Sequence, residues 1–238
     1  RAEDAGTEAI MSLYASMTEG AISYAMFTSY DKDNLNEDCG GYSYKNPYFI
    51  PSKALLDLYE TNDYRKIAWF TQTTAIPVNI DGSLYYDIFL FTKYAGNPNF
   101  NAAGFANGLV SSKPFLISEM YLIAAEGYYR AGGDSEAKKY LNMLQVKRKA
   151  SPTSLNEATI QKEWLRETVC EGLRMSTMKR WEIGFEGRAP QKNAAGLIVD
   201  IPKSSYSEKA MDFDVRAMCW PIPTYERKIN PNLVQNPG

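Results

Sequence analysis

Four glutamates have the residue type and the spacing that catalysis by carboxyl groups requires. Glu119 and Glu126 lie seven residues apart in one predicted helix, and Glu167 and Glu171 lie four residues apart in a later helical region. Each pair therefore lies close to one side of its helix. Hydrolysis of a glycosidic bond uses two carboxyl groups about 5 to 10 Å apart, one as the acid and the other as base or nucleophile. These residues raise the possibility of a glycoside hydrolase.

The same glutamates have a structural interpretation, which we favour. All four lie in predicted helical cores, and four arginines lie near them in the sequence: Arg148, Arg166, Arg174 and Arg180. Buried pairs of acid and arginine shift carboxyl pKa values without any catalysis. We therefore expect no catalytic residue, and we expect structural roles for Glu119, Glu126, Glu167, Glu171 and Arg174.

The composition excludes most other familiar sites. The chain has no histidine, which removes histidine-based zinc sites, Ser-His-Asp triads and Cys-His dyads. Its cysteines, Cys39, Cys170 and Cys219, are far apart, so there is no Cys-x-x-Cys motif for zinc or redox chemistry. Residues 31–38 have the acidic composition of a calcium loop, but Leu35 occupies a ligand position, and a solvated loop is the better interpretation. We expect neither a cofactor nor a metal.

Size and charge place the chain among ordinary packed domains. It has 238 residues, of which 45% are hydrophobic, enough for one sizeable core. A net charge of −2 gives no electrostatic reason to expect a nucleic acid partner. No stretch approaches the roughly 18 consecutive apolar residues of a membrane span. Because the chain begins at Arg1 without a signal peptide, we expect a fragment or a processed form, with any targeting signal upstream.

Hydrophobic periodicity predicts a mainly α-helical fold. The clearest helix runs from Phe115 to Ala131, with Pro114 in its first turn and Gly132-Gly133 at its end. The predicted buried stripe of this helix consists of Ile117, Tyr121, Ala124, Tyr128 and Ala131. Because the turn that follows is short, we expect the next helix, which begins at Asp134 or Ser135, to pack antiparallel against it.

Further helices are predicted over three ranges: residues 2–27, 52–60 and 156–181. The last of them contains Gly172, which predicts a break. The tail from residue 185 is predicted to be irregular, with one short turn at residues 223–228. We expect Trp220 to anchor this tail by packing.

Two runs rich in aromatic and β-branched residues predict a small antiparallel hairpin. They cover residues 64–76 and 82–94, and Asp81-Gly82 between them is a typical hairpin turn. The segments on either side of this region, residues 31–48 and 96–112, are predicted to be loops.

Ligand-binding residues are expected on the hairpin and the loops, because a rigid scaffold presents such groups there. An aromatic face can stack on the apolar C–H face of a sugar ring, while amide side chains bond its hydroxyl groups. The candidate binding residues are Tyr42, Tyr44, Trp69, Tyr85, Tyr86, Asn34 and Asn36. The same segments also contain Tyr48, Asn97 and Asn99. Ordinary packing is the alternative for each aromatic residue.

Three groups of motifs follow one another along the chain. The first is Glu119-Met-Tyr-Leu-Ile-Ala-Ala-Glu126, followed by Tyr140-Leu-Asn142. The second is Glu163-x-x-x-Glu167, Glu171-Gly172-x-Arg174 and Lys179-Arg180-Trp181. The third is Pro221-Ile-Pro223, Glu226, Asn230-Pro231 and Gln235-Asn-Pro-Gly238. In this order they resemble the motifs of the SusD/RagB family, glycan-binding lipoproteins of the Bacteroidetes outer membrane.

The resemblance covers about residues 50 to 238. It also includes Asp63-x-Arg65 and, later, Lys93-Tyr94. Trp164, Thr168 and Thr177 stand where the family usually has Arg, Leu and Asp, which weakens individual ion pairs but leaves the order of the motifs intact.

The resemblance implies a SusD-like helical scaffold, related to tetratricopeptide repeats, with long irregular loops and a small β-hairpin. The chain would be one C-terminal region, mixed over residues 1–112, a helical core over 113–184 and a packed tail over 185–238. It would bind glycan at the cell surface without cleaving it, together with a SusC-like TonB-dependent transporter. An N-terminal lipid anchor outside this chain would hold it at the outer membrane. A carboxylate-based glycoside hydrolase, and a transporter-docking module without its own glycan site, stay open as alternatives.

Overall fold

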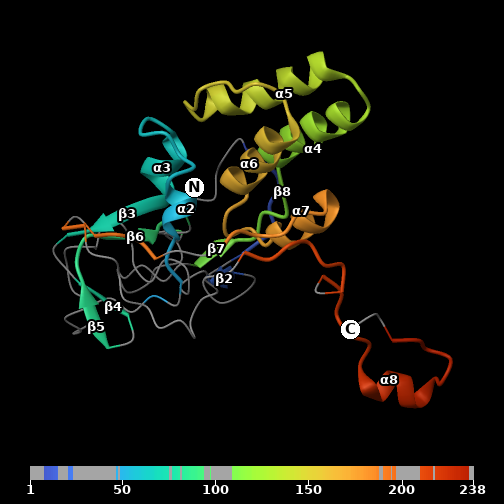
Figure 1. The fold of residues 1–238 in the computed structure, drawn as a ribbon. Helices are drawn as coiled ribbons and strands as arrows, with labels where there is room; N and C mark the ends of the chain where they lie inside the picture. Colours follow the sequence, from blue (N-terminus) through green and yellow to red (C-terminus); the bar gives the residue numbers. More distant parts are fainter. Residues whose placement is uncertain are drawn as a thin grey trace.

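The computed structural model describes residues 8–15, 21–23, 47, 49–74, 77–80, 82–93, 97, 109–187, 190–193, 195–196, 210–216 and 218–235. The described part is mainly helical, with short two-stranded sheets beside the helices (Figure 1). The predicted fold class is therefore confirmed. The predicted loops over residues 31–48 and 96–112 lie outside the described residues, apart from Pro47, Asn97 and residues 109–112.

The helices are α2 (Lys53–Leu56), α3 (Tyr64–Trp69), α4 (Ile117–Arg130), α5 (Asp134–Lys147), α6 (Glu157–Glu167), α7 (Arg174–Trp181) and α8 (Thr224–Ile229). The strands are β1 (Ala9–Met11), β2 (Ala21–Ser23), β3 (Phe70–Thr73), β4 (Val78–Ile80), β5 (Ser83–Tyr85), β6 (Ile88–Phe91), β7 (Leu109–Ser111) and β8 (Phe115–Leu116). The antiparallel pairs are β1–β8, β2–β7, β3–β6 and β4–β5. Among the described helices, none combines the length and the apolar character needed to cross a membrane.

Helices α4 and α5 form an antiparallel hairpin, as predicted, and α6 packs against it (Figure 1). Gly132 in the turn has a φ of +77°, the left-handed conformation that glycine adopts without a Cβ clash. Leu122 of α4, Leu141 of α5 and Ile160 of α6 are fully buried between the helices. The same cluster contains Trp164 and Trp181. This cluster is the core of the helical body.

The predicted buried stripe of α4 is wrong. The helix begins at Ile117, because Phe115 and Leu116 belong to strand β8, which pairs with β1. Ile117 and Tyr128 are 38% and 43% exposed. The buried face instead carries Ser118, Leu122, Ala125 and Glu126. Because α4 is apolar over more than half its circumference, its periodicity is compatible with several faces, and contact with α5 and α6 selects one.

The helix predicted over residues 2–27 is also wrong where the structure describes it. Residues 9–11 and 21–23 are strands that pair with β8 and β7, close to the start of α4. These partners lie about 90 to 105 residues away along the chain. Short segments with apolar residues at helical spacing take whichever structure a distant partner offers, which the local sequence does not reveal.

The helical region after residue 156 follows the prediction closely. Asn156 caps α6, because its side chain accepts a hydrogen bond from the backbone N–H of Thr159, whose hydroxyl accepts one from the Asn156 N–H in return. The chain then breaks between α6 and α7, where Gly172 has a φ of +77°. The predicted break at this glycine is confirmed.

The predicted hairpin is confirmed in its turn and wrong in its first half. Residues 64–69 form α3, because the Asp63 side chain accepts a hydrogen bond from the Arg65 N–H and caps a helix there. The chain then continues into β3, which pairs with β6. The tight hairpin is β4–β5, and Gly82 in its turn has a φ of +83°.

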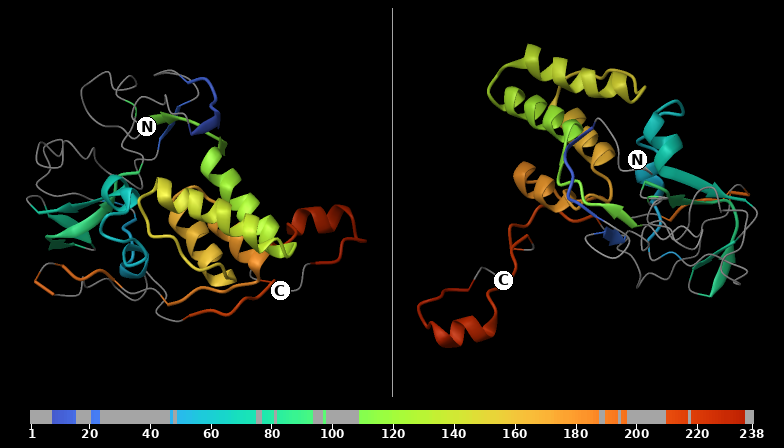
Figure 2. Two further views of the ribbon diagram at one scale, coloured as in Figure 1. Left: turned by 90° about the horizontal axis from the view of Figure 1, so that it is seen from above. Right: turned by 180° about the vertical axis from the view of Figure 1, so that it is seen from behind.

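The end of the chain projects away from the helical body (Figures 1 and 2). It carries α8, which has no buried residue, and Trp220 is 92% exposed. The side-chain amide of Gln235 accepts from the N–H of Ile222 and donates to its carbonyl, which closes the segment into a loop. The predicted turn at residues 223–228 is confirmed as α8. The prediction that Trp220 packs as an anchor is therefore wrong. Packing depends on where this segment lies relative to the rest of the fold, and the local sequence does not indicate that position.

Candidate functional site

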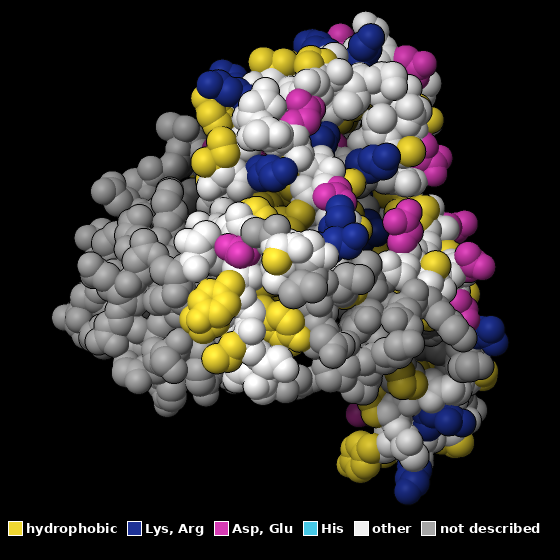
Figure 3. All heavy atoms as spheres, turned by 60° about the vertical axis from the view of Figure 1, so that its left-hand side comes forward, with side chains coloured by type: hydrophobic (Ala, Val, Ile, Leu, Met, Phe, Trp, Pro, Cys, Tyr) yellow, Lys and Arg dark blue, Asp and Glu magenta, His cyan; other side chains and the backbone are white. Residues whose placement is uncertain are grey.

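The structure describes three of the predicted aromatic binding residues: Trp69, Tyr85 and Tyr86. The exposed one lies at the end of hairpin β4–β5. Tyr86 follows β5 and is 49% exposed, and Leu84, two residues earlier, is 52% exposed. Tyr85 between them is half-buried and packs against a buried cluster that consists of Val78, Ile88 and Leu90. Because side chains alternate along a strand, Leu84 and Tyr86 belong to the outward side and Tyr85 to the inward side. Figure 3 looks from the side of the strands, where hydrophobic side chains gather.

Local contacts hold this hairpin in place. The Asn79 side chain accepts a hydrogen bond of 2.9 Å from the N–H of Gly82, which fixes the turn. Directly after Tyr86, Asp87 has a φ of +60°, and its carbonyl accepts from the Gln72 amide at 3.0 Å. A non-glycine residue in this conformation costs free energy, so the surrounding contacts must hold it there. Tyr86 is thus presented on a constrained backbone.

A buried glutamine joins the sheet β3–β6 to the start of α2. The Gln191 amide donates to the carbonyls of Pro51 and Phe89 at 2.6 and 3.0 Å. Its oxygen accepts from the Phe89 N–H at 2.9 Å. Gln191 therefore acts as an additional pairing partner for β6, although it lies about a hundred residues away in the sequence.

Trp69 was predicted as a binding residue on a strand or loop, and the structure places it elsewhere. It is the last residue of α3 and is only 6% exposed, within a cluster that contains Leu56, Tyr59 and Phe91. The Lys93 ammonium lies 4.0 Å from the centre of its ring. Trp69 is a core residue here, and its ring is not available for stacking on a sugar.

The remaining candidates are divided between buried and undescribed positions. Asn97 is 4% exposed, which leaves little of it for a ligand. The other predicted aromatic and amide residues lie outside the described residues: Asn34, Asn36, Tyr42, Tyr44, Tyr48 and Asn99. Among the described residues of the predicted set, the structure therefore places Tyr86 on the surface and Tyr85 on the opposite, inward side of the same hairpin.

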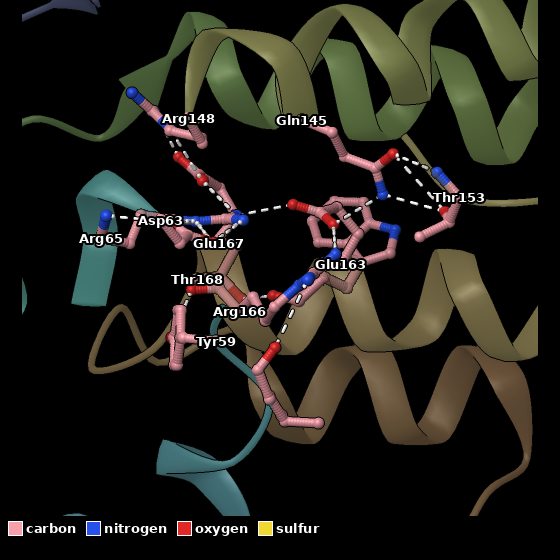
Figure 4. A network of polar contacts seen from close by, with 12 residues as sticks. Tyr59, Asp63, Arg65, Gln145, Arg148, Thr153, Glu163, Arg166, Glu167 and Thr168 are labelled. Carbon is pink, nitrogen blue, oxygen red and sulfur yellow. Dashed lines mark hydrogen bonds and ion pairs between the residues drawn. The ribbon is translucent and has the colours of Figure 1, made fainter. Parts of the chain in front are cut away.

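Of the predicted glutamates, Glu167 belongs to a buried network of ion pairs, together with Glu163 (Figure 4). Arg65 lies at its centre, 1% exposed, and its guanidinium contacts Asp63 at 2.8 Å, Glu163 at 2.6 Å and Glu167 at 3.1 Å. Glu167 also contacts Arg148 at 2.5 Å. The network links α3, α5 and α6, which come from three separate parts of the sequence. It explains why charged side chains occupy the interior of the helical body.

A second, smaller cluster surrounds Glu126 of α4. Its carboxylate accepts from Arg130 at 3.0 Å, from Arg180 at 2.7 Å and from the indole N–H of Trp181 at 3.2 Å. The guanidinium of Arg130 also stacks over the Trp181 ring at 3.9 Å. Glu126 thus ties α7 to α4, which confirms that this glutamate is an ion-pairing residue.

The electrostatics of the predicted glutamates differ from those of a catalytic pair. Burial by itself raises the pKa of Glu167, but Arg148, Arg65 and Lys93 outweigh it and lower that pKa to about 2. A general acid needs the opposite shift. Burial and the nearby Glu171 raise the pKa of Glu119. Glu171 is itself held by Lys93 in an ion pair of 2.6 Å, so it is not a free base or nucleophile beside Glu119.

The lowered pKa of Glu167 predicts a loss of stability in acid. Its ionised form stabilises the folded protein fully above about pH 4.5, and this contribution is lost as pH falls towards 2. We expect Glu167 alone to lower the free energy of unfolding by about 2 kcal/mol between pH 6 and pH 3. Urea unfolding at a series of pH values measures the total change in the free energy of unfolding. The NMR chemical shift of the Glu167 carboxyl carbon should titrate near pH 2. Titration of that carbon at pH 4 or above would contradict the ion-pair assignment.

Sequence reasoning did not predict that three residues of these clusters are buried and form ion pairs: Asp63, Arg65 and Lys93. They entered only through the family resemblance, because a single arginine or lysine in a short helix or strand gives no sign that it is buried. Arg174, which was expected to have a structural role, makes no ion pair with any described residue, and burial lowers its pKa. Within the described ranges, no group of three or more His, Cys, Asp or Glu side chains is placed to hold a metal ion.

Comparison with known proteins gives consistent matches to one family. A family model described as the SusD family matches residues 86–238. No curated protein matches the sequence.

Several solved structures share the fold. A SusD superfamily protein from Bacteroides fragilis NCTC 9343 is 19% identical with a TM-score of 0.61, and the match covers 98% of this chain and 52% of that one. Surface glycan-binding protein A from Bacteroides thetaiotaomicron is 20% identical with a TM-score of 0.62, covering 96% and 51%. A SusD superfamily protein from Parabacteroides distasonis ATCC 8503 is 16% identical with a TM-score of 0.59, covering 97% and 50%. The chain spans about half the length of these proteins.

Proposed function

The chain belongs to the SusD family, and from this membership we propose that it is a non-catalytic glycan-binding protein of the cell surface. The observation that carries the proposal is the family match over residues 86–238. Two proteins of the same fold are named surface glycan-binding proteins, from Bacteroides uniformis and Bacteroides thetaiotaomicron, which supports this ligand class.

The geometry indicates which part of the molecule would support the binding surface and which part would contact the ligand. The helical body is joined by buried ion pairs, so it would serve as a scaffold. Hairpin β4–β5 presents Leu84 and Tyr86 to solvent on a constrained turn. A Tyr ring offers a flat apolar face for the C–H face of a sugar and a hydroxyl group for a hydrogen bond. We place one sugar contact at Tyr86, with further contacts from the predicted residues Asn34, Asn36, Tyr42 and Tyr44.

The proposal extends to partner and location. A SusC-like TonB-dependent transporter would receive the bound glycan, and an N-terminal lipid anchor outside this chain would hold the protein at the outer membrane. Both follow from the family resemblance. The proposed absence of catalysis is supported by the ion pairs of Glu126, Glu167 and Glu171, since a carboxylate held by a cation is poorly placed to donate a proton.

We expect Tyr86→Ala to weaken glycan binding about tenfold, which corresponds to about 1.4 kcal/mol. The loss would come from the stacking contact and the apolar area of the ring. Affinity electrophoresis in gels containing a panel of polysaccharides finds the ligand, and isothermal titration with its oligosaccharide measures the affinity. Tyr225→Ala is the matched control, because Tyr225 is exposed on α8, away from the hairpin. Unchanged affinity of the Tyr86 variant would remove this residue from the site.

The same panel separates the three hypotheses for the protein. We expect retardation in at least one polysaccharide gel and no release of reducing sugar. Release that disappears in Glu119→Gln would establish a glycoside hydrolase, because Glu119 is the predicted glutamate whose pKa is raised. If only a longer form of the protein is retarded, the transporter-docking hypothesis is the better one for this region.

A further inference from the structure

Three hydrogen-bonding groups lie together beside the exposed ring of Tyr86. They are the Tyr86 hydroxyl, the Asp87 carboxylate and the side-chain oxygen of Gln72, and none of them bonds to another residue within the described part of the chain. The Gln72 amide donates to the Asp87 carbonyl at 3.0 Å, which holds these two residues next to each other. Tyr86 and Gln72 are exposed, and Asp87 is half-buried. A ligand at this surface can therefore use all three groups.

Asp87 occupies a backbone conformation that glycine adopts more readily. Its φ of +60° lies in the left-handed region, which costs free energy for a residue with a Cβ atom. The residue lies between β5 and β6 and interrupts the alternation of side chains along a strand, so Asp87 need not face away from Tyr86. A carboxylate kept at such a position, without a partner among the described residues, points to a role in contact with a ligand.

The chemistry of these groups favours a ligand that donates hydrogen bonds. An ionised carboxylate accepts hydrogen bonds and donates none, and its two oxygens can accept from two adjacent hydroxyl groups. The amide oxygen of Gln72 is a further acceptor, and the Tyr86 hydroxyl can accept or donate. A sugar ring stacked on Tyr86 would present its hydroxyl groups to these acceptors.

The charges around Asp87 disfavour an acidic ligand. Lys192 is exposed on the segment that contacts β6 through Gln191, but it forms no ion pair with Asp87. Lys93, beyond the end of β6, is buried and pairs with Glu171. A carboxylate on the ligand would therefore meet the negative charge of Asp87 without a cation between them, and like charges placed together weaken a complex.

We propose that Tyr86, Asp87 and Gln72 form a subsite that selects a neutral sugar, with Asp87 as the specificity-determining residue. The sugar ring stacks on Tyr86, and two adjacent hydroxyl groups donate to the Asp87 carboxylate. Acidic sugars are disfavoured by the charge of Asp87. This inference rests on the proposed function and names the ligand class of the same surface.

The test uses pairs of polysaccharides that share a backbone and differ in charge. Amylose, mannan and laminarin are each compared with a form in which the C6 hydroxyl groups are oxidised to carboxylates, and polygalacturonate is compared with its carboxyl-reduced form. Affinity electrophoresis finds the pair that binds, and isothermal titration with the corresponding oligosaccharides gives the ratio of the two affinities. We expect the neutral member to bind about tenfold more tightly than the acidic member.

Two substitutions of Asp87 test its role in this ratio. Asp87→Asn should reduce the ratio to less than about threefold, because asparagine tolerates the left-handed backbone but carries no charge. Asp87→Gly should reduce it likewise and should also weaken binding of the neutral member, because the acceptor is lost. Glu136→Gln is the control, since it removes one negative charge on α5, far from the hairpin, and should leave the ratio unchanged (Figure 1). A residue that only held the turn would alter both affinities alike.

Equal affinity for the two members of the pair, or an unchanged ratio in Asp87→Asn, would overturn this inference and leave the proposed function intact. Tighter binding of the acidic member that is lost in Lys192→Gln would also overturn it, because the surface would then hold acidic glycans through that lysine. If no polysaccharide of the panel binds, the proposed function fails and this inference fails with it.

Discussion

Arg65→Ala is expected to lower the free energy of unfolding by about 3 to 5 kcal/mol, enough to unfold a marginally stable domain. The substitution removes the cation that contacts Asp63, Glu163 and Glu167, all of which are at most 2% exposed. Three carboxylates would then lie together in the interior, with Arg148 and Arg166 left at the edges of the group. An uncompensated buried charge is far more costly than the loss of an exposed ion pair.

Urea unfolding followed by circular dichroism measures this loss. The matched control is Arg216→Ala, because Arg216 pairs with Asp214 on the surface, where the two side chains are 54% and 41% exposed. We expect the control to change the free energy of unfolding by less than about 1 kcal/mol. If the two variants were equally stable, Arg65 would not be the centre of the helical body.

Lys93→Met is expected to cost about 2 to 4 kcal/mol, because several polar groups lose their partner at once. The Lys93 ammonium donates to the carbonyls of Glu167 and Val169 at 3.0 and 2.9 Å and pairs with Glu171 at 2.6 Å. It also lies over the Trp69 ring. Glu167 is the last residue of α6, Val169 lies two residues beyond it, and Lys93 lies two residues after the end of β6. This side chain therefore joins the sheet to the helical body.

Hydrogen exchange gives the more specific measurement for this variant. We expect amides of β3 and β6 to exchange at least tenfold faster in Lys93→Met, with smaller changes in α4 and α5. Lys66→Met is the control, because the bond that the Lys66 ammonium makes within the described part of the chain is a long one, 3.4 Å to the Tyr59 carbonyl. Faster exchange spread evenly over all helices would show that Lys93 stabilises the whole fold and does not specifically hold the sheet.

The two variants separate the roles of buried charge in this protein. Arg65 joins helices to one another, and Lys93 joins the helices to the sheet that leads to the β4–β5 hairpin. A ligand contact at Tyr86 would depend on both, since the hairpin is positioned through β6 and β6 is held against the end of α6. We therefore regard the buried charges of Arg65 and Lys93 as part of the scaffold that would present the binding surface.

Local signals in the sequence were sufficient for much of the helical body. Gly132 and Gly172 each end or interrupt a helix through a left-handed backbone, and Asn156 caps α6 through its own side chain. The Asp-Gly step placed the turn of the β4–β5 hairpin. These features act within a few residues of one another, so the local sequence is enough to predict them.

The tertiary structure decided everything that depends on a distant partner. It selected the Leu122 face of α4, turned residues near the start of the chain into strands, and buried Trp69 while exposing Trp220. It also assembled Arg65 with glutamates about a hundred residues away. The sequence by itself determined the type, order and ends of most helices, because capping and turn formation are local. Burial and ion pairing come from which surfaces meet, and only the folded chain brings those surfaces together.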